Sequence, residues 1–203
     1  MLKKLFSLIL FVTFIQSSIF CMAGKISNKN FVEDFLITSE RAFVKAAGNG
    51  DKDKILKLIG EGVNINALDL TGHTALMVAC FVGNHEMVKF LIDQGANVNI
   101  QTYAGGTTSL LLATQLLVSL KTPQMKLIIR HLINAGANVN LEDNYGNTPL
   151  MYASNSGQKD AVEFLIKKGA DVKATNNNGQ SALSWAKDMR HQEIVELLEK
   201  YQS

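Results

Sequence analysis

The stretch that decides the fold is residues 69–101, which read DLTGHTALMVACFVGNHEMVKFLIDQGANVNIQ. Its closing letters recur as GVNIN from Gly62, GANVN from Gly95, GANVN from Gly136 and GADVK from Gly169, in steps of 33, 41 and 33. Its opening recurs from Thr74, Thr108, Thr148 and Ser181, in steps of 34, 40 and 33. A period of about 33 residues, with an eight-residue surplus in the third unit, explains both series. The chain is therefore predicted to be a repeat protein.

Each unit is predicted to form two helices. The opening threonines and Ser181 suit the N-cap of the first helix, because their side-chain oxygens accept hydrogen bonds from free backbone N–H groups. In the second helix, apolar residues recur at i, i+3 and i+4 and make one apolar stripe. Gly95, Gly136 and Gly169 suit the left-handed position that ends a helix. Small residues in the first helices let adjacent units approach closely; these are Ala79, Ala113, Ala153 and Ala186.

The T-x-L-x-x-A opening, the G-x-x-x-x-V-x-x-L-I middle and the G-A-x-V-N closing resemble ankyrin repeats, over about residues 39–201. This resemblance implies an all-α repeat solenoid, in which stacked helix-turn-helix units are joined by short β-hairpin-like turns. We expect about five units within residues 39–203, preceded by a linker and N-terminal capping segment at residues 24–38. Such stacks generally bind proteins through their turn tips and the concave face of their first helices.

The third unit, which has the eight-residue surplus, also contains an uncharged run, TTSLLLATQLLVSL, at residues 107–120. Alignment places one extra residue near Gly105 and seven between Ala113 and Gln124, which predicts a first helix lengthened by about two turns. Thr122 and Pro123 are then the N-cap and first residue of the second helix. The extra part of this unit contains apolar residues that have no counterpart in the other units, among them Leu116, Leu117 and Leu120. Their side chains either pack on a neighbouring helix or form extra apolar surface, and we favour packing.

Both end units are predicted to act as polar caps. Lys54 replaces an apolar residue of the other units, and Glu199 takes the buried position of Ile92 and Ile166. A solenoid that ended without such changes would expose its core. The upstream segment would cover the first unit with Phe31, Val32, Phe35 and Leu36.

Residues 1–23 have the layout of a secretory signal peptide. Lys3 and Lys4 precede an apolar stretch, and the small residues Ala23 and Gly24 flank the expected cleavage point. We expect cleavage and export to the periplasm or the extracellular space. The alternative is an uncleaved membrane anchor, since residues 5–24 lack charge over a length that can span a bilayer. The Lys-, Ile- and Asn-rich composition looks bacterial.

Charge and chemistry exclude several classes of function. The net charge of +2 includes two signal lysines, so the remaining chain is neutral and argues against a nucleic-acid partner. Cys80 is expected to be a buried, inert thiol, and with no pattern of catalytic or metal-ligating residues we expect no enzyme, metal site or cofactor. The histidines are expected to be solvated helix or turn residues; they are His73, His85, His131 and His191.

The expected function is binding of a protein or peptide by a monomeric, secreted or envelope-associated module. A structural or inhibitory subunit of an exported enzyme is the alternative. Exposed aromatic and aliphatic side chains surrounded by amide side chains are typical of a surface that binds a protein. In a second interpretation, Phe81 and Val82 pack under the longer third unit instead of contacting a partner. The spacing maps the candidate contacts to Leu70, Thr71, His73, Phe81, Val82, Tyr103, Tyr145, Asn147 and Asn155.

Overall fold

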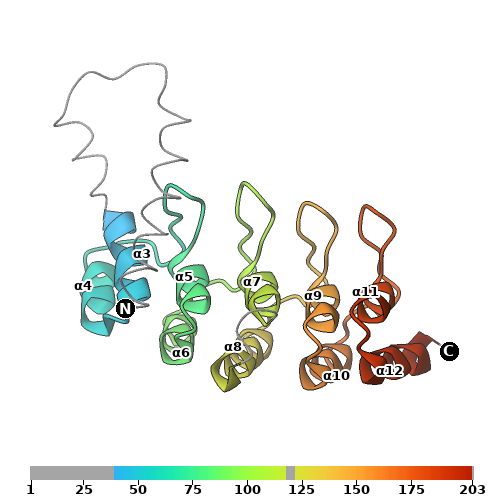
Figure 1. The fold of residues 1–203 in the computed structure, drawn as a ribbon. Helices are drawn as coiled ribbons and strands as arrows, with labels where there is room; N and C mark the ends of the chain where they lie inside the picture. Colours follow the sequence, from blue (N-terminus) through green and yellow to red (C-terminus); the bar gives the residue numbers. More distant parts are fainter. Residues whose placement is uncertain (1–38, 118–121, 203) are drawn as a thin grey trace, which may run out of the picture.

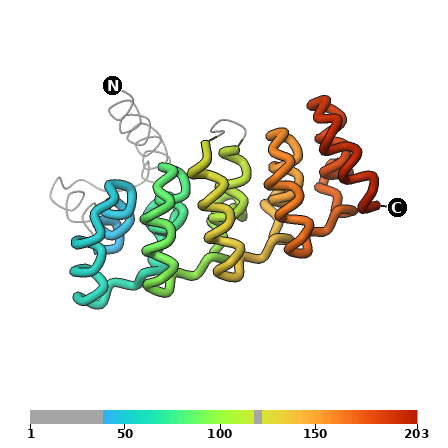
Figure 2. The backbone as a smooth tube through the Cα atoms, turned by 90° about the horizontal axis from the view of Figure 1, so that it is seen from below, coloured from blue at the N-terminus to red at the C-terminus, as the bar shows by residue number. Residues whose placement is uncertain are grey.

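The computed structural model describes residues 39–117 and 122–202, in which ten helices form five consecutive pairs. The pairs stack side by side in one row, with first helices in one layer, second helices below them and narrow hairpins projecting above (Figure 1). Figure 2 shows the same row from below. The helices are α3 (Ser39–Asn49), α4 (Lys52–Gly60), α5 (Ala75–Phe81), α6 (His85–Asp93), α7 (Ser109–Leu116), α8 (Pro123–Asn134), α9 (Pro149–Asn155), α10 (Lys159–Lys167), α11 (Ala182–Asp188) and α12 (Gln192–Gln202).

The predicted all-α solenoid with hairpin-like turns is confirmed. The described residues contain no strand, and only isolated antiparallel bridges join Leu68 to Thr74 and Thr175 to Ser181. None of the helices in these ranges combines the length and apolar character that a membrane crossing requires. The predicted signal peptide and the capping segment at residues 24–38 lie outside the described residues.

The predicted N-caps of the first helices are confirmed at all four openings. The side-chain oxygen of Thr74 accepts a hydrogen bond from the backbone N–H three residues later, at 3.2 Å. Thr108 and Thr148 make the same bond at 3.1 and 3.3 Å. Ser181 adds a reciprocal bond, because the hydroxyl of Ser184 accepts from the Ser181 backbone N–H. Each opening motif therefore fixes where a first helix begins.

The G-A-N-V-N closing ends one unit and holds the next. Gly95 and Gly136 have φ angles of 91° and 87°, the left-handed values predicted for the ends of α6 and α8. The carboxamide of Asn99 then bridges to the following unit, where it accepts from the Asn138 backbone N–H at 2.8 Å and donates to the Gly136 carbonyl at 3.1 Å. Asn140 makes the same two bonds one unit later.

The core runs through the row as a continuous layer between helices. One leucine from each of the last four second helices is fully buried, and burying such a side chain stabilises the fold by about 1.5–3 kcal/mol. The small residues predicted to allow close approach are fully buried where first helices meet, which confirms their role. These residues are Leu91, Leu132, Leu165 and Leu198, and Ala79, Ala113, Ala153 and Ala186.

The prediction of a first helix lengthened by two turns in the third unit is wrong. α7 has 8 residues, one more than α5, while α8 has 12 residues, three more than α6. The connection between them is longer as well, because residues 117–122 separate α7 from α8, where only residues 82–84 separate α5 from α6. Pro123 is the first residue of α8 and Thr122 its N-cap, as predicted, although the Thr122 side chain makes no capping bond.

Polar residues stand at both ends of the row. Lys54 is exposed on α4, where the equivalent residues of the inner units are buried. Glu199 is also exposed and forms an ion pair with Lys187 at 2.9 Å, which joins α12 to α11. Ile92 and Ile166, at the position of Glu199, are half-buried rather than buried. The segment containing Phe31 and Leu36 lies outside the described residues.

Candidate protein-binding surface

The hairpins and the first helices form what we call the inner face of the row (Figure 1). The three central first helices, α5, α7 and α9, contain no charged residue. Every second helix carries at least one lysine or arginine, so the charge lies mainly on the other side. An uncharged surface loses little hydration energy when a partner covers it, so the centre of the inner face suits a protein interface.

Three large side chains project from successive hairpin tips. Tyr103 is 82% exposed and Tyr145 is 70% exposed, and Leu70 is exposed as well. Such side chains make effective anchors, because a partner that covers them gains a large apolar area at a small entropic cost. The structure places these predicted contacts at the surface, and their role in binding stays a prediction.

The hairpin tips are held in a row by bonds between neighbours. The backbone N–H of Asn144 donates to the Gly105 carbonyl at 3.0 Å, and that of Asn177 donates to the Tyr145 carbonyl at 3.0 Å. Gly106 permits this approach, since a Cβ atom there would lie 2.6 Å from the Asn144 Oδ1 atom. The exposed side chains thus sit on a braced scaffold, which lowers the entropic cost of binding.

Thr71 and His73 shape the first tip. Asp69 Oδ1 accepts from the backbone N–H groups of both residues, at 2.9 and 3.0 Å, and from the Thr71 hydroxyl at 2.6 Å. Because that hydroxyl donates to Asp69, the His73 Nδ1 atom, 2.7 Å away, donates to Thr71 Oγ1. Both residues are half-buried and fix the tip that presents Leu70.

Asn147 is not an exposed contact, and that prediction is wrong. Its side chain is buried, at 8% exposure. Its Nδ2 donates to Asp143 Oδ2 at 3.1 Å and its Oδ1 accepts from Asn176 at 2.8 Å, so it joins two hairpins. The Tyr152 hydroxyl completes this cluster by donating to Asp143 Oδ2 at 2.7 Å. Burial, followed by the bond to Asp143, raises the pKa of Tyr152 to about 12.

The predicted contacts at the far ends of the first helices differ in exposure. Val82 is exposed, and Phe81 and Asn155 are half-buried. The Asn155 carbonyl lies 3.1 Å from His191 Nε2. His191 precedes α12, so the prediction that this histidine lies within a second helix is wrong.

The interpretation of Leu117 as extra apolar surface is wrong, because its side chain is fully buried. Packing, the favoured alternative, is therefore confirmed for this residue. Leu116 is half-buried against the core, and Leu120 lies outside the described residues. The uncharged run is thus mostly core as far as Leu117.

Trp185 lies on the inner face, although it is not among the contacts predicted from the sequence. Its ring meets that of Tyr152 edge to face, with centroids 5.5 Å apart and planes at 76°. Both residues stand four positions after an N-cap, in line with Val78 and Leu112. The sequence alone shows an apolar or aromatic residue at this register position in all four units, and in the structure these side chains are half-buried.

Two segments of the chain, residues 43–121 and 116–203, match the family model described as ankyrin repeats (3 copies). The chain belongs to the ankyrin repeat family. Ankyrin repeats generally mediate protein–protein interactions and are typically non-catalytic, and no enzyme family matches. A comparison with curated proteins gives no match.

The ankyrin stack offers little conventional site chemistry in its described part. No three His, Cys, Asp or Glu side chains between 39 and 117 or between 122 and 202 are grouped as metal ligands. Cys80 is buried, as predicted, and burial raises the pKa of its thiol above the ordinary value, which makes it a poor nucleophile.

Proposed function

We propose that this ankyrin repeat protein is an exported binding module that holds a protein or peptide partner on its inner face. The observation that carries the proposal is the uncharged centre of that face, beneath the exposed Tyr103 and Tyr145. Apolar and aromatic anchors in a surface with few charges are typical of the central part of a protein interface.

Export rests on the signal-like segment at residues 1–23, and the fold is compatible with an oxidising compartment. Once that segment is removed, the chain keeps one cysteine, Cys80, which is buried. The domain therefore needs no disulfide and exposes no thiol for oxidation.

Site-specific photo-crosslinking in the native source tests both parts of the proposal. A photoreactive amino acid replaces Tyr145 on a hairpin tip and, as the matched control, Tyr201 at the end of α12, where the side chain is 48% exposed. The proposal predicts one defined adduct from position 145 and none from position 201, in protein whose intact mass lacks residues 1–23. Equal labelling at the two positions would contradict the inner face as the binding surface. A cytosolic pool that retains residues 1–23 would contradict export.

A further inference from the structure

A groove with a cavity of about 390 Å³ lies between α8 and α10, on the side opposite the inner face. Apolar side chains supply most of its lining, and Lys126 pairs with Asp160 across it at 2.8 Å. The lining residues are Pro123, Lys126, Leu127, Ile129, Arg130, Asp160, Ala161 and Phe164.

Leu127 is anomalous for its position in the repeat. The residues in register with it are all acidic, and they are Asp53, Glu86, Asp160 and Glu193. Three of those acids bind a lysine of the preceding unit, in the pairs Lys52–Glu86, Lys126–Asp160 and Lys159–Glu193. Leu127 makes no such pair, and 41% of it is exposed in the groove. An apolar residue where the repeat otherwise places a carboxylate creates an unusual surface on a charged helix layer.

Two cations beside the groove lie against an aromatic ring. The guanidinium of Arg130 lies 5.3 Å from the Phe164 ring centroid, and the Lys168 ammonium lies 5.6 Å from the same centroid. Within the described residues, neither cation is in an ion pair, since the nearby Asp160 is bound to Lys126. A stacked guanidinium keeps its N–H edges free, so it can still donate to a carboxylate.

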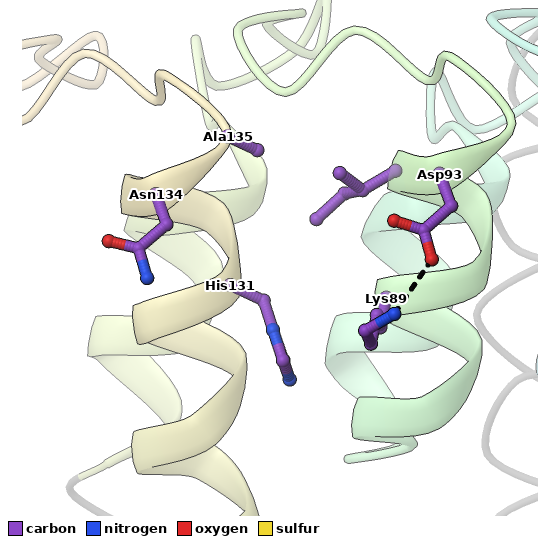
Figure 3. Close-up of a pocket in the computed structure, with 6 residues that line it drawn as sticks. Lys89, Asp93, His131, Asn134 and Ala135 are labelled. Atoms are coloured by element: carbon purple, nitrogen blue, oxygen red, sulfur yellow. Dashed lines mark hydrogen bonds and ion pairs between the residues drawn. The ribbon is translucent and has the colours of Figure 1, made fainter.

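The neighbouring groove between α6 and α8 lacks this excess of positive charge (Figure 3). Its cavity is smaller, about 210 Å³, and Lys89 is already bound to Asp93 at 2.9 Å. His131 points into it from α8 (Figure 3), and burial together with His85 and Lys89 lowers the pKa of this imidazole, so it adds little charge. Between α4 and α6, Lys52 also lies over an aromatic ring, that of Phe90, but it is already paired with Glu86.

We propose that the groove between α8 and α10 is a second docking site, which takes an acidic peptide segment with an apolar side chain. The apolar side chain packs against Leu127 and Phe164, and flanking carboxylates bind Arg130 and Lys168. This site is separate from the inner face, so a single molecule can hold two partners or two parts of one partner.

Fluorescence anisotropy with defined peptides tests the proposal on the full chain. The probe is a short, capped peptide of glutamates around two central leucines, with matched peptides in which serine replaces leucine or lysine replaces glutamate. We expect binding of the glutamate–leucine peptide alone, weakening as salt increases. Arg130→Gln should weaken it about fivefold or more, and Leu127→Glu should abolish it, because that carboxylate repels the probe.

The matched control is Lys54→Gln, which removes one positive charge from the exposed face of α4 and should leave the affinity unchanged. Because Leu127→Glu restores the acidic residue type of the other units, the variant is expected to fold. No binding of the glutamate–leucine peptide, equal binding of the serine peptide, or an unchanged affinity in both groove variants would overturn the proposal. The variant lacking both Tyr103 and Tyr145 side chains should bind the probe normally, which separates this test from that of the inner face.

Discussion

At the scale of single residues, Tyr152 shows how the inner face combines a fold contact with a surface. Its ring packs against Trp185, and its hydroxyl donates to Asp143, the carboxylate that also orders the hairpin of Tyr145. The sequence predicted the helix caps, because a Thr or Ser before an apolar repeat has one local role. It did not predict the burial of Asn147, because the partners of that amide come from Asp143 and from Asn176 in the next unit.

The Tyr152 hydroxyl should make stability sensitive to alkaline pH. Its pKa lies at about 12 in the fold, above the ordinary value of 10.0, so its contribution is complete below pH of about 10 and is lost as the pH rises towards 12. Tyr152→Phe should lower the unfolding free energy by about 1 kcal/mol at neutral pH. Urea unfolding of both proteins at neutral and alkaline pH checks this, and an equally steep alkaline loss in the variant would contradict it.

At the scale of elements, neighbouring units are coupled by a few repeated side-chain bonds. Asn99 and Asn140 each accept from one backbone N–H and donate to one carbonyl in the next unit, which explains the final letter of the G-A-N-V-N motif. Lys173 takes that position after α10, at the end of the fourth unit, and within the described residues no G-A-x-V-N closing follows α12 for it to bind. The motif thus encodes the stacking of units as well as the end of a helix.

Asn99→Ala should therefore destabilise the stack, and Lys173→Ala is its matched control. Asn99→Ala removes both bonds of the side chain and leaves the Asn138 N–H without its acceptor, so we expect a loss of about 1–3 kcal/mol in unfolding free energy. Lys173 is exposed at the same motif position, and its replacement should change the free energy by less than about 0.5 kcal/mol. Chemical denaturation measures both, and equal losses would refute this role of the motif.

The third unit marks the limit of element prediction from sequence. Counting residues located the surplus but could not divide it, because one more residue in α7, three more in α8 and a longer connection between them satisfy the same count as a longer first helix. Tertiary packing decides the division. Met125, in the first turn of α8, is fully buried, and so is Leu117, which directly follows α7.

At the scale of the whole molecule, the row divides into a charged layer of second helices and an inner face with an uncharged centre. The charged layer can be predicted from the sequence, because the apolar stripe of each second helix packs in the stack and leaves the polar side of the helix to solvent. The inner face was predictable only as a set of register positions. Which side chains project from it depended on contacts between hairpins, such as the bond from Asn144 to Gly105.

The double variant Tyr103→Ala with Tyr145→Ala tests whether the hairpin tips of the inner face bind the partner. The measured quantities are the affinity for the crosslinked partner and the thermal midpoint. Both side chains are mostly exposed anchors, so we expect a loss of about 30-fold or more in affinity. The thermal midpoint should stay within about 2 °C of the unmodified protein. Tyr201→Ala should change neither quantity. An unchanged affinity in the double variant would contradict the inner face as the binding surface, and so would a collapse of its thermal midpoint.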